Sequence, residues 1–315
     1  MRDLFALLCV QFAKRNTFKR KERFLAWLAH SAQDLGFEVH IDEKKKGKLK
    51  SRNLLVGNFS KCENIVVTGY DTPSKVMMPG YKYYPFNFNK DHKQEMIALG
   101  IQMASSIFVI FLFYLLVRGF NDYALWLKII AVIIGAGMVL ASFYLGKGMA
   151  NKYNFNKNTS ALCVGITLMQ EAAAVKNNKT AFVFCDNVTA SFYGFAQIAE
   201  NLEKKIKGKN ILIMDCIASD GDVYLAYKKA DKKLAETVQK GMPECKLLER
   251  SSTVPGCFSW FDNLVYVTSG TADDEHEVII KGTRNRKDAH LDMSRLEQVH
   301  QMMADYLGVK VIESK

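Results

Sequence analysis

Closely spaced metal-binding side chains are missing from this sequence. Its seven cysteines are an odd number, with no CxxC pair and no zinc-finger spacing. Its six histidines include no H-E-x-x-H pair. These absences exclude a zinc finger and a zincin-type helix, and the unpaired cysteines favour a reduced domain that faces the cytosol.

Internal repeats and low-complexity segments are also absent. The 315 residues are 49% hydrophobic and 24% charged, which is typical of globular proteins and excludes disorder, a collagen-like repeat and a small disulfide-stapled fold. The net charge is +11, which favours an anionic surface such as a lipid headgroup layer. No helix-turn-helix signature and no basic platform with interleaved aromatic residues occurs, so we expect no nucleic-acid partner.

Long uncharged runs are confined to one part of the chain. Residues 97–117 contain no charge and are long enough to cross a hydrocarbon core of about 30 Å. Residues 124–145 are interrupted only by Lys128, which can extend toward the headgroups. The linker RGFNDY is too short for a domain, so these residues predict a two-helix transmembrane hairpin. The apolar run at residues 4–10 is shorter and has no cleavage site after it, which indicates an amphipathic helix instead of a secretion signal.

Positive charges flank the predicted hairpin on both sides. The flanking lysines are Lys82, Lys90, Lys93, Lys147, Lys152 and Lys157, against Arg118 and Asp122 in the turn. The positive-inside rule therefore predicts a cell-membrane protein with two spans, and with both termini and the globular domain in the cytoplasm. The basic runs at residues 44–50 and 204–209 are expected to be solvated, and beside a membrane they can also touch anionic lipid.

Outside the hairpin, helical and strand patterns alternate. Apolar residues at helical spacing predict helices at residues 18–35 and 293–308, whereas TAFVFC and NILIMD are buried-strand patterns. The predicted fold is an α/β three-layer sandwich with a mixed, mostly parallel sheet. Residues 1–96 and 147–315 are expected to form one cytoplasmic domain, interrupted by the hairpin at residues 97–146.

Several motifs in this order resemble the zinc-dependent aminopeptidase fold of clan MH, whose members include bacterial leucyl aminopeptidases and glutaminyl cyclases. The family has a strand ending in A-H-x-D-[ST], which NIVVTGYDTP resembles, and a G-x-N-D-N-A-S-G helix start, which NFNKNTSA resembles. An E-E pair before a helix corresponds to FVFCDNVTASFYGFAQIAE, and a strand ending in Asp corresponds to NILIMD. A late H-[ST]-x-x-D before a terminal helix corresponds to KGTRNRKDAHLDMSRL. The resemblance covers most of residues 18–90 and 150–307.

The resemblance implies a degenerate metal site. Carried over by position, the first His ligand, the bridging Asp, the Glu base, its neighbouring Glu ligand and the last His correspond to Gly69, Lys157, Val188, Thr189 and Gly282. Asp215 is retained among the ligands, and so is Asp71, which orients the first His in the family. One carboxylate does not hold Zn²⁺ where three or four protein ligands are normal. No catalytic residue and no cofactor is therefore expected.

Lys157 has two possible roles at this stage. Its ammonium can replace the metal electrostatically by pairing with Asp71 or Asp215, so that neither carboxylate is buried without compensation. The alternative is a lysine that points to water, as lysines generally do.

The sequence therefore suggests a membrane-anchored, catalytically inactive aminopeptidase-like protein that acts as a binding or scaffold module for a peptide, a lipid headgroup or a membrane-protein partner. The alternative is an active zinc aminopeptidase with a shifted site made of Asp71, Asp215 and His290. Because the hairpin enters between Asp71 and the segment around Asn158, the former active-site face is expected to lie near the membrane. The oligomeric state is not indicated.

Overall fold

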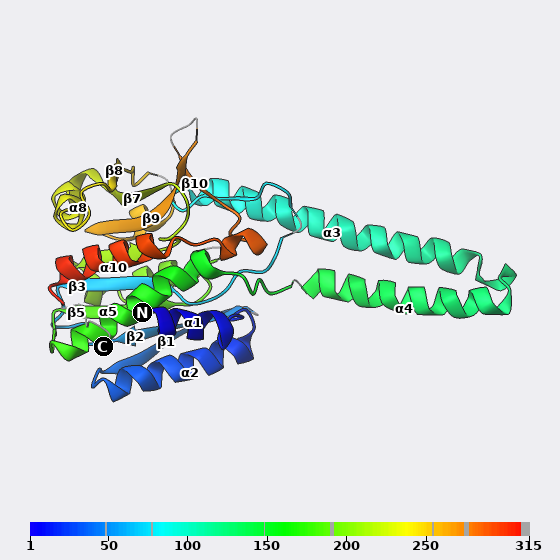
Figure 1. Ribbon diagram of the computed structural model, residues 1–315, viewed down its shortest axis with the longest axis horizontal. Coiled ribbons are helices and arrows are strands. Elements are labelled where there is room, and N and C mark those ends of the chain that lie inside the picture. The colour runs from blue at the N-terminus through cyan, green and yellow to red at the C-terminus, as the bar shows by residue number, and fades with distance from the viewer. Residues whose placement is uncertain are drawn as a thin grey trace.

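The computed structural model of the chain describes residues 1–47, 49–76, 78–147, 149–189, 192–253, 255–273 and 277–309. Lys48 of the first basic run, and Ala190 and Ser191 of the segment matched to the E-E motif, lie outside these residues. A globular body carries a pair of long helices that project from one end (Figure 1).

Ten strands form one mixed sheet, whose main path runs β1-β2-β5-β3-β6-β9-β10-β4, with β7 and β8 attached beside β9. The strand bounds are β1 Val39–Lys46, β2 Leu49–Val56, β3 Asn64–Gly69, β4 Lys82–Tyr83, β5 Thr180–Cys185, β6 Asn210–Met214, β7 Asp222–Tyr227, β8 Lys246–Glu249, β9 Leu264–Ala272 and β10 Val278–Lys281. The central strands β5, β3, β6 and β9 are parallel, whereas β1, β2, β10 and β4 pair antiparallel at the sides.

Helices cover both faces of the sheet, which gives the predicted three layers. They are α1 Arg2–Val10, α2 Phe18–Asp34, α5 Ala161–Ala174, α6 Tyr193–Asn201, α7 Glu203–Ile206, α8 Lys232–Gln239, α9 Cys257–Trp260 and α10 Met293–Leu307. Alternate side chains of β3 enter different cores: Val66 packs with α1, α2, α5, α8 and α10, whereas Ile65 and Val67 pack with α6, α7 and α9.

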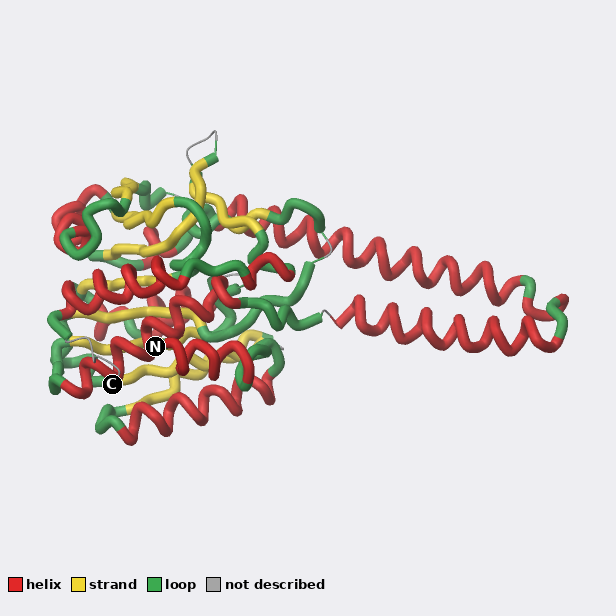
Figure 2. Tube along the Cα trace, viewed as in Figure 1, coloured by secondary structure: helices red, strands yellow, loops and turns green. Residues whose placement is uncertain are grey.

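The projecting pair consists of α3 Phe88–Arg118 and α4 Leu125–Lys147, joined by a short turn (Figure 2). Both helices are long and apolar enough to cross a bilayer, with a mean hydropathy of 2.2. Only 6% and 11% of their most apolar windows are buried, so neither is a core helix. α3 begins nine residues before the predicted span, because its polar first turns pack on the globular body, where Asp91 is buried; Ala98, at the start of the span, is buried as well.

Two local predictions differ from the structure. The basic stretch around Lys45 is not a long turn, because β1 and β2 continue through it and reverse at Gly47. The polar segment Phe155–Ser160 is not a simply capped helix start. It forms an irregular turn in which Asn158 adopts φ +65°, and Ser160 makes no side-chain capping bond to α5.

Candidate functional site

The candidate site lies at the carboxyl ends of β3, β5 and β6, where ligands bind in many α/β sheets. β3 leads into Asp71, β5 leads into Val188 and Thr189, and β6 leads into Asp215. These strands are adjacent and parallel, so the residues that follow them meet at one edge. The turn Phe155–Ser160 adds Lys157 from the chain that follows α4.

Lys157 is buried, with 2% of its surface exposed, and its Nζ lies 2.5 Å from Oδ2 of Asp215. The predicted ion pair is therefore confirmed with Asp215, and the water-exposed alternative is wrong. The ammonium also lies 3.7 Å from the centroid of the Tyr83 ring, a cation–π contact. Burial alone lowers the pKa of Lys157, but the Asp215 carboxylate more than offsets this, so the pKa is raised. The side chain is a permanent cation at neutral pH.

Two tyrosines complete the surroundings of Asp215. The hydroxyl of Tyr83 donates to Asp215 Oδ2 at 2.6 Å, and that of Tyr266 donates to the same oxygen at 3.2 Å. Burial, with the nearby Asp215 charge, raises the pKa of both phenols well above 10, so both remain donors. Asp215 Oδ2 therefore accepts from three groups and has little capacity left for another ligand.

Asp71 faces a different set of partners. Its carboxylate accepts from the backbone N–H groups of Val188 at 3.1 Å and Thr189 at 3.3 Å, and from the Thr189 hydroxyl. The amide of Asn158 donates to its Oδ1 at 3.2 Å and to its backbone oxygen at 2.7 Å. Asp71 thus joins the end of β5 to the Phe155–Ser160 turn, and among the described residues its carboxylate makes these hydrogen bonds instead of an ion pair with Lys157.

Gly69 is surrounded by these groups. A Cβ built on it would lie 2.2 Å from Val188 Cγ2 and 2.9 Å from Asn158 Nδ2. Real Cβ atoms do not approach this closely, so the space of a histidine side chain is already filled by Val188 and Asn158. Gly282 also leaves little room for a side chain, because its φ is +84° and a Cβ there would lie 3.0 Å from Lys287 Cβ.

Asp288 is a neighbour that sequence reasoning missed. It is 3% exposed, and its two carboxyl oxygens accept from the backbone N–H of Lys157 at 3.3 and 3.2 Å. Burial raises its pKa well above the ordinary value, although the Lys157 amide and ammonium act in the opposite direction. Burial of this carboxyl therefore favours its protonated form.

His290, proposed for a shifted metal site, is exposed and lines a separate cavity of about 340 Å³ with Asn156, Ser219, Asp220, Lys287 and Asp288. Among the described residues, no group of three His, Cys, Asp or Glu side chains is placed to hold a metal ion. Asp71, Asp215 and His290 are therefore not gathered into the shifted site. The residues of the former site do not fit zinc either, because a buried ammonium occupies the retained carboxylate.

A second buried cation, Arg15, binds the chain segments that border the site. It is fully buried and donates to the backbone oxygens of Tyr70 and Phe12 and, at 2.8 Å, to the Thr159 hydroxyl. Burial lowers its pKa to about 10. It thus joins the α1–α2 segment to both chain segments that border the site. A basic residue between two polar ones gave no signal of this role in the sequence.

Comparisons with solved structures identify the fold. The chain superposes on Tannerella forsythia glutaminyl cyclase with a TM-score of 0.59, 10% identity, and coverage of 99% of this chain and 98% of that one. Porphyromonas gingivalis glutaminyl cyclase superposes with a TM-score of 0.56 and 10% identity, over 97% of this chain and 96% of that one. The Legionella pneumophila LapA aminopeptidase superposes with a TM-score of 0.54 and 9% identity, over 98% of this chain and 71% of that one. The fold is therefore that of the bacterial aminopeptidases and glutaminyl cyclases.

A scan against protein-family models finds no match. A search of curated proteins likewise finds no significant match.

Proposed function

We propose that this chain is a membrane-anchored binding or scaffold protein that keeps the aminopeptidase-like fold without peptidase chemistry. The observation that carries the proposal is the buried pair of Lys157 and Asp215 at 2.5 Å. The position that resembles the bridging metal ligand supplies a positive charge and no lone pair. The retained carboxylate is neutralised from within the chain.

Electrostatics supports this assignment. A divalent cation brought to Asp215 would lie beside the Lys157 ammonium in a buried setting, where repulsion between like charges is only weakly screened. Displacing the ammonium would require Lys157 to leave Tyr83 and Asp215 together. No general base is offered at the corresponding positions either, because Val188 and Thr189 carry no carboxylate.

Membrane anchoring is the second part of the proposal. The exposed apolar surfaces of α3 and α4 need a cover, and their length and composition suit a bilayer. We place the globular domain in the cytoplasm, because Lys75, Lys90, Lys93 and Lys152 flank the hairpin on the domain side.

The test is a joint measurement of zinc content and turnover on the full chain purified in detergent. The protein and its Asp215→Asn variant are incubated with zinc, freed of excess metal and analysed for zinc by elemental analysis. Hydrolysis of aminoacyl nitroanilides and cyclisation of a peptide with N-terminal glutamine are assayed in parallel. We expect near-zero zinc and no turnover in both proteins.

The opposite result would establish the competing function. One or two zinc ions per chain, lost in the Asp215→Asn variant, together with hydrolysis that a chelator abolishes, would make this an active metallo-aminopeptidase. Comparison of the thermal unfolding midpoints shows whether the variant is folded, so that loss of zinc is not confused with loss of structure.

A further inference from the structure

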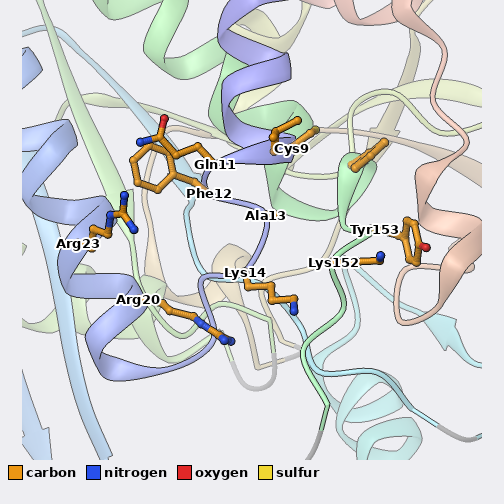
Figure 3. Close-up of a pocket in the computed structure, with 11 residues that line it drawn as sticks. Cys9, Gln11, Phe12, Ala13, Lys14, Arg20, Arg23, Lys152 and Tyr153 are labelled. Atoms are coloured by element: carbon orange, nitrogen blue, oxygen red, sulfur yellow. The ribbon is translucent and has the colours of Figure 1, made fainter.

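A basic opening lies beside the candidate site, between the α1–α2 segment and the chain that follows α4. It has a volume of about 530 Å³ and an aromatic floor that includes Phe12 and Phe155. Lys14, Arg20 and Arg23 line it from the α1–α2 segment, and Lys152 lines it from the opposite side, with its ammonium directed toward Tyr153 (Figure 3). We call these four side chains and the space between them the basic pocket.

The charge of the basic pocket is not neutralised by its surroundings. Its lining contains no Asp or Glu. All four cations are exposed, and in the described part of the chain no ion pair involves any of them. Arg20 donates only to a neutral oxygen, Oδ1 of Asn16, at 3.2 Å. Four like charges that share one opening repel each other, so an anion is the ligand that this arrangement favours.

The pocket lies close to the end of α4, and this position indicates where its anionic ligand comes from. Lys152 follows the end of α4 by five residues, which span at most about 18 Å. The chain is fixed at this point, because Lys75 N donates to Met149 O at 2.6 Å and Ser74 forms a β-bridge with Ala150. The chain segments that line the pocket, the α1–α2 turn and residues 152–155, therefore lie at the end of the globular body from which the hairpin projects (Figure 1).

Further cations surround the same place. The ring of Tyr153 has Lys152, Arg286 and Lys75 at 5.0, 5.7 and 5.8 Å from its centroid. Val10, at the end of α1, is 81% exposed and lies on the pocket rim. A basic rim with an exposed apolar residue is the combination that a lipid–water interface accommodates.

We propose that the basic pocket binds the phosphate of an anionic phospholipid headgroup in the leaflet that faces the globular domain. The guanidinium groups of Arg20 and Arg23 bind phosphate oxygens in pairs, and Lys14 and Lys152 add point charges. The volume is in the range of small-molecule sites. A headgroup with more than one negative charge, such as a phosphomonoester, matches four cations best. This inference rests on the membrane anchoring proposed above.

The test is a titration of the full chain, purified in detergent, with short-chain phosphatidic acid. Dioctanoyl phosphatidic acid, dioctanoyl phosphatidylcholine and glycerol 3-phosphate are compared by microscale thermophoresis. The test variant combines Lys14→Ala, Arg20→Ala, Arg23→Ala and Lys152→Ala. The control variant removes the same charge at the opposite end of the body, through Lys204→Ala, Lys205→Ala, Lys207→Ala and Lys229→Ala.

We expect phosphatidic acid to bind at least tenfold more tightly than phosphatidylcholine, and the test variant to lose that preference while the control keeps it. Equal weakening in both variants would mean a diffuse charge effect and would overturn the pocket. Equal binding of glycerol 3-phosphate and phosphatidic acid would assign the pocket to a soluble phosphate compound and overturn the lipid source. Resistance of the protein to carbonate extraction from membranes tests the anchoring separately, so a failure of one proposal is not read as a failure of the other.

Discussion

At the scale of single residues, the site is defined by a buried lysine, Lys157, whose ammonium compensates the buried carboxylate of Asp215. Asp215 and Lys157 are each almost inaccessible, and removing an ion from water is costly unless a partner compensates it. Their contact at 2.5 Å, with two tyrosine hydroxyls on the same oxygen, provides that compensation. Asp215, the carboxylate that resembles a metal ligand, is thus held in a buried ion pair with Lys157.

The first prediction concerns this pair. Lys157→Met is expected to lower the free energy of unfolding by about 3 to 5 kcal/mol, because Asp215 then stays buried without its partner. Asp215→Asn added to Lys157→Met should restore part of that loss, since the two tyrosines can still donate to the amide oxygen. Denaturant unfolding in detergent measures both, with the exposed Lys233→Met as control. A single variant as stable as the unchanged protein would contradict the assigned pairing.

The second prediction uses the raised pKa of Asp288. Between the unfolded pKa near 4 and the higher folded pKa, the folded protein holds a proton that the unfolded chain has lost. This group therefore makes stability fall as pH rises, by up to about 1.4 kcal/mol per pH unit. Asp288→Asn should remove that dependence and become the more stable protein at neutral pH. Unfolding measured from pH 4 to 8 checks it, and parallel curves for the two proteins would refute it.

Sequence reasoning found only part of the residue-level site. Lys157 and Asp215 were identifiable because each occupies a motif position where its presence, or its replacement, has a chemical consequence. Tyr83, Tyr266 and Asp288 were not, because they reach the site through tertiary packing. Tyr83 arrives through the pairing of β4 with β10, and this two-residue strand leaves almost no pattern in the sequence.

At the scale of elements, the first turns of α3 connect the hairpin to the site. Glu95 on α3 binds Arg284 at 2.7 Å, and the Tyr81 hydroxyl donates to the same carboxylate at 2.6 Å. Arg284 also donates to the backbone oxygens of Ser74 and Thr189. One side chain thus joins α3, the chain after β3 and the chain after β5.

The third prediction tests this connection. Glu95→Gln should lower the free energy of unfolding by about 1 to 3 kcal/mol, because a nearly buried guanidinium loses a charged acceptor. Glu63→Gln is the matched control, since its pair with Lys179 is largely exposed and should change stability little. Unfolding midpoints measure both variants. Equal effects in the two would show that the Glu95–Arg284 pair is an ordinary surface contact.

Element prediction succeeded where periodicity was strong. The helices α2 and α10 follow from apolar residues at helical spacing, and the spans of α3 and α4 follow from long uncharged apolar runs. The start of α3 was missed because residues 88–96 are polar, and their helical state depends on packing against the body. The turn Phe155–Ser160 was missed because its geometry is imposed by contacts with Asp71 and Asp288, which are distant in the sequence.

At the scale of the whole molecule, the directions of the strands determine which surfaces lie at the end of the body that carries the hairpin, the end that faces the membrane under the proposed anchoring. β1 is antiparallel to β2, β2 is antiparallel to β5, and β5 is parallel to β3, so β1 runs in the same direction as β3. The turn between β1 and β2 therefore lies at the end of the sheet where β3 ends and the chain continues toward the hairpin. Residues 204–209 precede β6, which is parallel to β3, and therefore lie at the opposite end. Of the two basic runs, we expect only residues 44–50 to meet anionic lipid.

The fourth prediction tests the orientation. The described cysteines are buried except Cys9, so a Cys9→Ser background leaves little native reactivity. Asn121→Cys, in the exposed turn between α3 and α4, should react with an impermeant maleimide added to intact cells. Lys204→Cys on the globular domain should react only after permeabilisation. Labelling of Lys204→Cys alone in intact cells would place the domain outside.

The pairing of β3 also dictates an order of events during biosynthesis. Both neighbours of β3 in the sheet, β5 and β6, lie after the hairpin, so the central strand has no partner until the hairpin has left the ribosome. At ordinary elongation rates, β3 waits roughly ten seconds, unpaired and strongly apolar. If the chain is anchored as proposed, insertion of α3 and α4 into the bilayer therefore precedes closure of the domain. A nascent chain stalled before β5 would hold an open strand edge beside the membrane, where a chaperone would be needed to prevent its aggregation.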